Sequence, residues 1–288
     1  MLKATLECIP CILQGLLNLI KHSTRDETQQ RKLFREIVKL FGEEDWNRGP
    51  FEFYRIAQSF ISKTTGVADP YHELKEDSNK RALELYPEMK RIVLESDDLL
   101  KTAANLATLV NVIDYGVTME TALENLVKKV KTVEFAIDDF ERLKEKVLKS
   151  GSLIYFLDNA GEVVFDKLFL ETMLDVRGKP FERLTIVCRK EPILNDVVLE
   201  DVEEAGLHKL PNVSIEAIDS DLKFIWGNEK VGVLERIKQH DVVIFKGQAN
   251  FENFLDYSNA FFLLVVKCSV VSRILGVKVG DLVLKYSP

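Results

Sequence analysis

The chain has 288 residues, 46% of them hydrophobic, and 39 Lys and Arg against 46 Asp and Glu give a formal net charge of −7. This composition supports a sizeable buried core and argues against disorder. Nonspecific nucleic-acid binding needs a basic face, whereas charges of both signs are interspersed here, so we expect no nucleic-acid partner.

Residues 1–148 are predicted to form a helical N-terminal domain. Apolar residues recur there at helical spacing, as at Leu33, Ile37 and Leu40, and convincing strand alternation is absent. The longest apolar run of the whole chain, FFLLVV at 261–266, is strand-sized and far below the roughly 18 residues of a membrane-spanning helix. We therefore expect no membrane partner.

Residues 149–288 are predicted to form a Rossmann-like α/β domain. Short apolar runs alternate there with amphipathic segments, which is typical of strand, helix, strand units in a mostly parallel sheet. The predicted strands span 153–157, 184–188, 213–218, 242–245 and 261–266. The predicted helices between them span 163–174, 196–205, 230–239 and 251–258.

Polar side chains follow several of these strands. Asp158 and Asn159 follow the first strand, Asn195 and Asp196 lie in the loop after the second, and Lys246 follows the fourth. Ligands of open α/β sheets bind outside the carboxyl ends of the strands. Carboxylate and amide oxygens suit hard divalent cations, and a lysine beside a glycine turn suits phosphate oxygens. Each residue alone also fits a helix cap or a turn, but their convergence on one sheet edge favours a ligand site.

Six motifs carry a resemblance to a known family. They are CIPC at 8–11, DPYHELKEDSN at 69–79, ANLATLVNVIDYG at 104–116, FLDNAGE at 156–162, RKEPILND at 189–196 and KGQANFE at 246–252. In these motifs, which span nearly the whole chain in the same order, the sequence resembles the metal-dependent damage-control phosphatases, in particular their prokaryotic branch with an N-terminal CxxC.

The resemblance implies a helical N-terminal region on a Rossmann-like domain. It further implies a metal bound through Asp158, Asn159 and Asp196, and a phosphate handled by Lys246 with Asn250 nearby. One departure concerns the NxxD motif, where similar proteins have glycine before the Asn and this chain has a valine. The further candidates for substrate binding are Asn195, Glu162, Asn111, Asp114, Lys75 and Asn79.

The expected function is hydrolysis of small phosphate esters, such as sugar phosphates or damaged phosphometabolites, with Mg, Mn, Co or Ni as cofactor. Either water or a carboxylate of Asp158 or Asp196 attacks phosphorus, and the sequence leaves both routes open. The sequence argues against the haloacid-dehalogenase type of phosphatase, because Ala160 stands where the second Asp of that pattern would be. The alternatives are an S-adenosylmethionine-dependent methyltransferase, although DNAGE has only one glycine, and a non-enzymatic metal-binding protein with structural aspartates.

Four cysteines in a chain of this length fit a reducing cytoplasm better than a disulfide framework, so we expect a cytoplasmic location. Cys8 and Cys11 form a C-x-x-C in a helical context without a second such motif. A pair of core residues and a redox or metal role shared with Cys268 both remain open. Cys188 ends a predicted strand and is expected to be buried.

Overall fold

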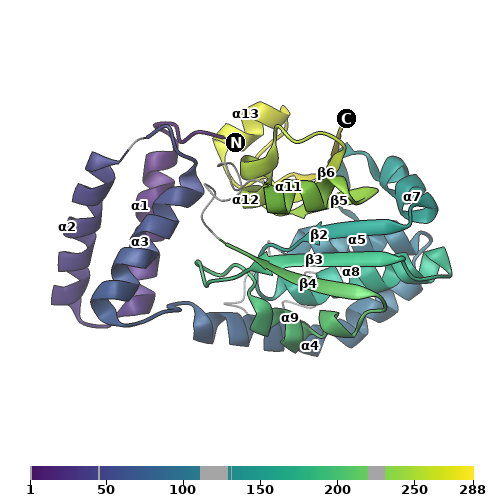
Figure 1. Ribbon diagram of the computed structural model, residues 1–288, viewed down its shortest axis with the longest axis horizontal. Coiled ribbons are helices and arrows are strands. Elements are labelled where there is room, and N and C mark those ends of the chain that lie inside the picture. Colours follow the sequence, from purple (N-terminus) through teal and green to yellow (C-terminus); the bar gives the residue numbers. More distant parts are fainter. Residues whose placement is uncertain (1, 45, 111–128, 131, 220–230) are drawn as a thin grey trace.

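The computed structural model describes residues 2–44, 46–110, 129–130, 132–219 and 231–288 (Figure 1). In these residues one sheet has the strand order β1-β7-β6-β5-β2-β3-β4. Every neighbouring pair is parallel except β6 with β7. The strands are β1 (Phe135–Asp138), β2 (Ser152–Phe156), β3 (Arg183–Arg189), β4 (Val213–Ile218), β5 (Val242–Lys246), β6 (Ala260–Val265) and β7 (Leu282–Ser287).

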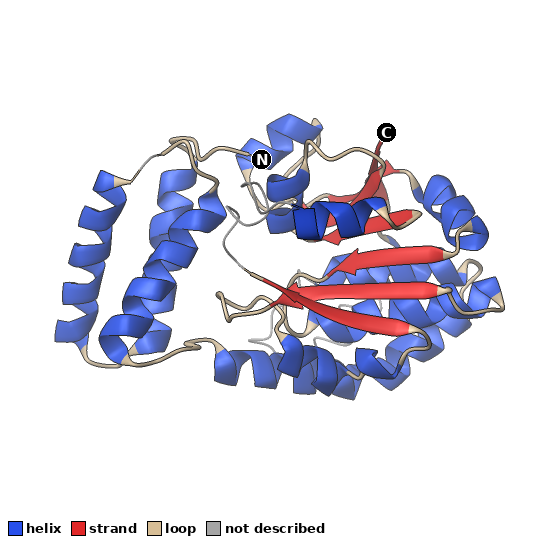
Figure 2. Cartoon of the chain, viewed as in Figure 1, coloured by secondary structure: helices blue, strands red, loops and turns tan. Residues whose placement is uncertain are grey.

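Helices cover both faces of this sheet and form a separate group at one end of the molecule (Figure 2). The separate group consists of α1 (Cys8–Ser23), α2 (Glu27–Glu43) and α3 (Pro50–Thr65). The helices on one face are α4 (His72–Leu94), α5 (Leu99–Leu109), α7 (Phe140–Lys149), α8 (Glu162–Arg177) and α9 (Leu199–Ala205), which is followed by the 3₁₀ turn η2 (Leu207–Lys209). The helices on the other face are α11 (Val231–Lys238), α12 (Gln248–Phe254) and α13 (Ser269–Leu275).

The central strands are buried on both faces, which explains their continuous apolar sequence. In β2, Leu153 and Tyr155 join the core beneath α5 and α8, whereas Ile154 and Phe156 join the core beneath α12. Successive residues of a strand point to opposite faces, so one short apolar run serves two cores. The α/β class with a mostly parallel sheet is thus the predicted one.

The direction of strand addition reverses at β2. From β2 the chain adds β3 and β4 on one side, and then crosses to place β5 on the other side of β2. The chain therefore leaves β2 and β5 toward opposite faces of the sheet, into α8 and α12. The FLDNAGE and KGQANFE motifs lie at these two strand ends.

Two strands were missed by the sequence analysis. β1 lies within the region predicted to be wholly helical and pairs with β7, which was also not predicted. Moreover, α4 and α5 pack on α8 rather than on α1 to α3, whose core is a cluster of its own that includes Leu16 and Phe53. The division of the chain at residue 148 stays a prediction.

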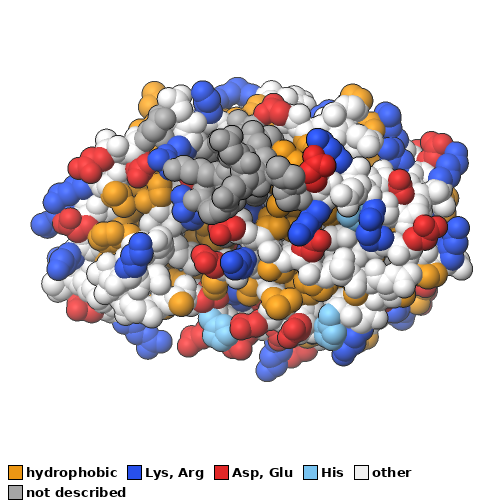
Figure 3. Space-filling model, in the orientation of Figure 1, with side chains coloured by type: hydrophobic (Ala, Val, Ile, Leu, Met, Phe, Trp, Pro, Cys, Tyr) orange, Lys and Arg blue, Asp and Glu red, His pale blue; other side chains and the backbone are white. Residues whose placement is uncertain are grey.

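No helix in the described part of the chain is long and apolar enough to cross a membrane. On the face seen in Figure 3, basic and acidic side chains are interspersed between apolar ones. No broad basic surface is visible on that face, in line with the formal net charge of −7.

Candidate metal and phosphate site

A pocket of about 310 Å³ lies between the carboxyl edge of the sheet and the helices α1 and α3. Asp158 and Asn159 from the loop after β2 line it, together with Asn195 and Asp196 from the loop after β3. Cys8 and Cys11 of α1, Phe51 and Tyr54 of α3, and Gln248 and Glu252 of α12 complete much of the remaining wall.

Backbone hydrogen bonds join the loops after β2 and β3. The Ala160 amide donates to the Asn195 carbonyl at 2.9 Å, and the Val197 amide donates to the Asp158 carbonyl at 2.9 Å. Asn159 and Asp196 form an isolated antiparallel bridge between these bonds. The predicted metal ligands Asp158, Asn159 and Asp196 therefore lie side by side on one wall of the pocket.

The carboxyl group of Asp158 lies directly against Gly247, at the end of β5. Gly247 has φ +83° and ψ 161°, a conformation that residues with a side chain rarely adopt. A Cβ atom at this position would overlap the Asp158 carboxyl group, well inside the 3.0 Å that real Cβ contacts respect. The glycine of the KGQANFE motif is thus required by the close approach of Asp158.

The orientation of the Asn159 amide is fixed by two carboxylates. Its Nδ2 donates to Asp158 Oδ2 at 2.7 Å and to Glu162 Oε1 at 2.7 Å. Both hydrogens of the amide nitrogen are then engaged, which leaves Oδ1 as the atom that can serve a cation. Glu162, a predicted substrate-binding residue, contacts Asn159 in this arrangement.

Asp196 is buried beside the guanidinium group of Arg189. Arg189 at the end of β3 donates from Nε to Asp196 Oδ2 at 2.8 Å, and both side chains are less than a tenth exposed. Burial raises the pKa of Asp196 to about 6, and the negative charge of Asp158 contributes, while Arg189 opposes the shift. The two aspartates therefore repel each other, and a cation between them would relieve this repulsion.

The donor set fits a hard cation. Two carboxylates and an amide oxygen are the ligand types that Mg²⁺ and Mn²⁺ prefer. Among the described residues, no group of three or more His, Cys, Asp and Glu side chains could hold a metal ion. A cation at this wall would accordingly depend on the amide oxygen of Asn159 beside the two carboxylates.

Lys246 lies beneath the pocket wall. Its side chain is 1% exposed, and Nζ donates to the Ala107 carbonyl at 2.8 Å and pairs with Asp166 at 2.9 Å and Glu162 at 3.4 Å. Burial lowers the pKa of Lys246, but Asp166 and Glu162 outweigh burial, so the net shift is upward. Lys246, predicted to bind the phosphate, is not among the described residues that line the pocket.

Asn250 and Asn79 tie the site loops to the rest of the fold. Asn250 Nδ2 donates to the carbonyls of Leu157 at 3.0 Å and Lys246 at 2.6 Å, which fastens the end of β5 to the end of β2. Asn79 Oδ1 accepts from the Gly161 amide at 2.6 Å. The Gly161 amide, at the start of α8, is therefore already bonded.

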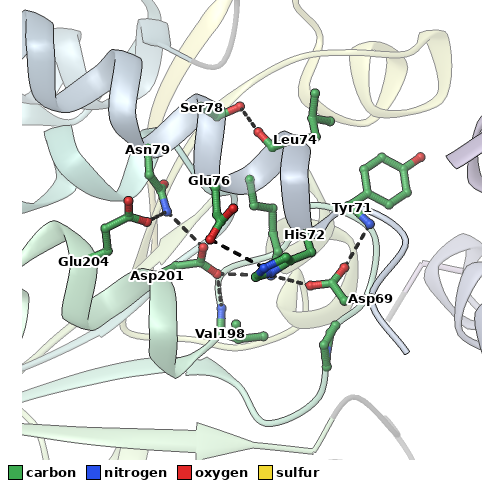
Figure 4. Close-up of polar contacts among 12 residues, drawn as sticks. Asp69, Tyr71, His72, Leu74, Glu76, Ser78, Asn79, Val198, Asp201 and Glu204 are labelled. Carbon is green, nitrogen blue, oxygen red and sulfur yellow. Dashed lines mark hydrogen bonds and ion pairs between the residues drawn. The ribbon is translucent and has the colours of Figure 1, made fainter. Parts of the chain in front are cut away.

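Lys75 belongs to a buried cluster away from the pocket wall. Its Nζ pairs with Asp69 at 2.9 Å and with Asp201 at 3.3 Å, and Asn79 donates to Asp201 at 3.0 Å and to Glu204 at 2.7 Å. Figure 4 shows Asp201 between Asn79 and Asp69, with α4 above it. This cluster joins α4 to α9. The two remaining candidates, Asn111 and Asp114, lie outside the described residues.

Lys267 was missed although one rule would have found it. It follows β6, a predicted strand, and lines the pocket beside Cys268 and the ligands named above. The charge of Lys267 lowers the pKa of Asp196 and of Glu252, so its ammonium group lies near both carboxyl groups. Burial nevertheless raises the pKa of Glu252 to about 7. Reading the residues after every predicted strand would have included Lys267.

All four cysteines are free thiols. Cys8, Cys11 and Cys268 line the pocket, with Cys8 buried, Cys11 exposed and Cys268 half-buried. Cys188 is buried in the core, as predicted, and burial raises its pKa to about 11. The two readings of the C-x-x-C motif both stay open.

Comparison with known proteins gave consistent matches over the full chain. The family model of the damage-control phosphatase ARMT1-like domain matches residues 4–283. The sequence is 32% identical over 286 residues to the damage-control phosphatase of Archaeoglobus fulgidus, covering 96% of this chain and 97% of that protein. It is 30% identical over 290 residues to the damage-control phosphatase PH1575 of Pyrococcus horikoshii, covering 98% and 97%. The crystal structure of PH1575, described as a DUF89 family protein, matches with a TM-score of 0.87 at 30% identity and covers 100% of both chains.

Proposed function

Because the chain belongs to the damage-control phosphatase ARMT1-like family, formerly DUF89, and is a phosphatase, we propose that it hydrolyses small phosphate monoesters with a divalent metal ion. The observation that carries the proposal is the convergence of Asp158, Asn159 and Asp196 with Lys267 on one pocket. Membership in this family gives the methyltransferase alternative no support. The CxxC branch within the family stays a prediction.

Asp158, Asn159 and Asp196 would hold the metal, with Mg, Mn, Co or Ni as candidates. What a divalent cation supplies when bound is Lewis-acid stabilisation of charge on the phosphoryl group. Arg189 keeps Asp196 in place through their buried ion pair. A phosphate group carries negative charge, so without a cation the carboxylates of this wall would repel it.

Lys267 is the residue that we assign to the phosphate. It is the lysine of the described pocket wall, and its flexible ammonium group suits phosphoryl oxygens. In hydrolysis the oxygen of water bonds to phosphorus, the bond from phosphorus to the ester oxygen breaks, and a proton goes to the departing alcohol. Lys267 would offset the charge that develops on the transferred group.

The volume of the pocket limits the substrate. About 310 Å³ is at the lower end of the range for small-molecule sites, so a compact ester fits. Phe51 and Tyr54 of α3 add aromatic side chains to the pocket wall. The helices α1 and α3 would therefore contact the organic part of the ester.

The test is a phosphate-release assay on protein stripped with a chelator. A panel of sugar phosphates, nucleotides and an aryl phosphate is supplied with Mg²⁺, Mn²⁺, Co²⁺ or Ni²⁺. We expect metal-dependent release that Asp158→Ala abolishes. Lys267→Met should lower kcat/KM on the order of 10²-fold. Lys278→Met, which removes an exposed lysine of the same chain segment, is the matched control. Release of no phosphate from any ester with any metal would overturn the proposal.

A further inference from the structure

A buried chain of side chains leads from α8 and β5 to the Asn159 amide. Asn159 donates to Glu162 at 2.7 Å, Glu162 pairs with Lys246 at 3.4 Å, and Lys246 pairs with Asp166 at 2.9 Å. Tyr155 donates its hydroxyl to the same Asp166 oxygen at 2.7 Å. Each of these side chains is less than a tenth exposed.

We propose that Glu162 and Lys246 are positioning residues, which turn the Asn159 amide so that its oxygen, and not its nitrogen, faces the metal. The inference rests on the proposed function, because it concerns the metal ligand Asn159. It also gives Lys246 a different task from the phosphate contact predicted from the sequence.

The physical argument is that an amide has two ends of opposite polarity. With Nδ2 toward Asp158 and Glu162, Asn159 makes two charge-assisted hydrogen bonds. If the amide turned over, its oxygen would face two carboxylate oxygens and its nitrogen would face the cation. Both changes are repulsive, so the carboxylate of Glu162 selects the orientation that can bind metal.

Lys246 keeps Glu162 an acceptor. Its ammonium group occupies Glu162 Oε2 and so leaves Oε1 for Asn159. The Ala107 carbonyl and Asp166 hold the ammonium group from the other side. Groups of this kind, which orient a ligand without touching the metal, change metal affinity about 10- to 100-fold when mutated.

Glu162→Gln is the main test, because it preserves size while it changes hydrogen-bonding character and removes the charge. A glutamine that accepts from Lys246 turns its Nε2 toward Asn159, which inverts the preferred amide orientation. We expect the Kd for Mn²⁺, measured on the whole chain by electron paramagnetic resonance of free Mn²⁺, to rise about 10- to 100-fold. Thermal unfolding of each variant confirms that it is folded.

Two controls separate orientation from charge. Glu252→Gln removes another buried carboxylate of the same pocket, one that is not a partner of the Asn159 amide nitrogen. The Kd for Mn²⁺ of this variant should change about threefold or less, as for a charge effect alone. In an Asn159→Asp background either end of the side chain offers an oxygen. Glu162→Gln should then leave the Kd unchanged or lower it.

The outcomes are distinct. If the wild-type chain binds no Mn²⁺, the proposed function fails and the inference fails with it. If wild type binds Mn²⁺ but Glu162→Gln binds it equally well, only the positioning role is refuted. An equal loss of affinity from Glu162→Gln in the Asn159 and Asn159→Asp backgrounds would also refute it, since a charge effect alone predicts that result.

Discussion

Replacing Gly247 with alanine should displace the carboxyl group of Asp158 and abolish most of the phosphatase activity. The new Cβ would overlap this carboxyl group, so either the side chain of Asp158 or the loop after β5 must move. A metal ligand and the residues that surround it would lose their alignment. No other chemical group of the site changes in this variant, which makes it a clean test of position.

The magnitude follows from two separate costs. Holding alanine at φ +83° and ψ 161° stores backbone strain on the order of 1–3 kcal/mol, which lowers the free energy of unfolding. Displacement of a catalytic group by about 1 Å can lower the rate on the order of 10²-fold. We therefore expect a loss of kcat/KM near 10²-fold in a protein that is still folded at 25 °C.

The assay compares kcat/KM with saturating Mn²⁺ and the midpoint of urea unfolding. Gly66→Ala is the control, because Gly66 also has positive φ, +77°, but a Cβ there meets nothing within 4 Å. It should lose stability without losing activity. If Gly247→Ala retained wild-type kcat/KM, the close approach of Asp158 to Gly247 would not be needed for activity, and our reasoning would be refuted.

Three further variants or treatments test other parts of the structure. Lys75→Met should lower the free energy of unfolding by about 3–5 kcal/mol in urea, because it leaves Asp201 buried without its cation, while kcat/KM changes little. Iodoacetamide should inactivate the enzyme by modifying the exposed Cys11 on the pocket wall, and inorganic phosphate should protect it. Asp241→Asn should cost about 1 kcal/mol at pH 7, after allowance for solvent exposure, since hydrogen bonds from Ser152 hold the pKa of Asp241 below its usual value. This stabilisation is present above pH 4 and is lost as the pH falls through the pKa of Asp241 in the folded protein. The free energy of unfolding of the variant should therefore fall less on acidification than that of the wild type.

Each of these has a result that contradicts it. A large fall in kcat/KM without a change in unfolding would assign Lys75 to the active site after all. Inactivation of Cys11→Ser by iodoacetamide at the wild-type rate would point to another thiol. For Asp241→Asn, the difference in free energy of unfolding between variant and wild type should shrink between pH 5 and pH 3. If it does not shrink, the hydrogen bonds from Ser152 are not the source of this difference.

The sequence analysis predicted the strands that have a recognisable local sequence pattern. β2, β3, β5 and β6 were found because each contains an apolar run, and β4 was found because its sequence VSIEAI alternates apolar and polar residues. β1 has only four residues, and its partner β7 lies at the far end of the chain. Four residues are too few to show an alternating pattern, so local patterning could not supply β1. β7 contains the apolar run LVL and also pairs with β6, so its omission was an oversight of the sequence analysis.

For the site, the rule of strand ends placed Asp158, Asn159 and Asp196 together, and the structure brings them together. The same rule could not tell which way Lys246 points. Val242 and Ile244 of β5 belong to the core beneath α8, and by the two-residue period Lys246 shares their face. This alternation is visible in the sequence, and it places the side chain of Lys246 on the face of the sheet where Asp166 of α8 lies. What the sequence could not supply is how α1 and α3 close the pocket.

Six of the seven strands form two blocks that are each contiguous in sequence, β2 to β4 and β5 to β7, and β1 extends the second block beside β7. The pairing of β2 with β5 joins the two blocks. The three proposed metal ligands all come from the first block, whereas Lys267 comes from the second. A phosphate bound by the metal and by Lys267 at the same time would hold the two blocks together. Metal and phosphate together should therefore raise the free energy of unfolding by more than the sum of their separate effects.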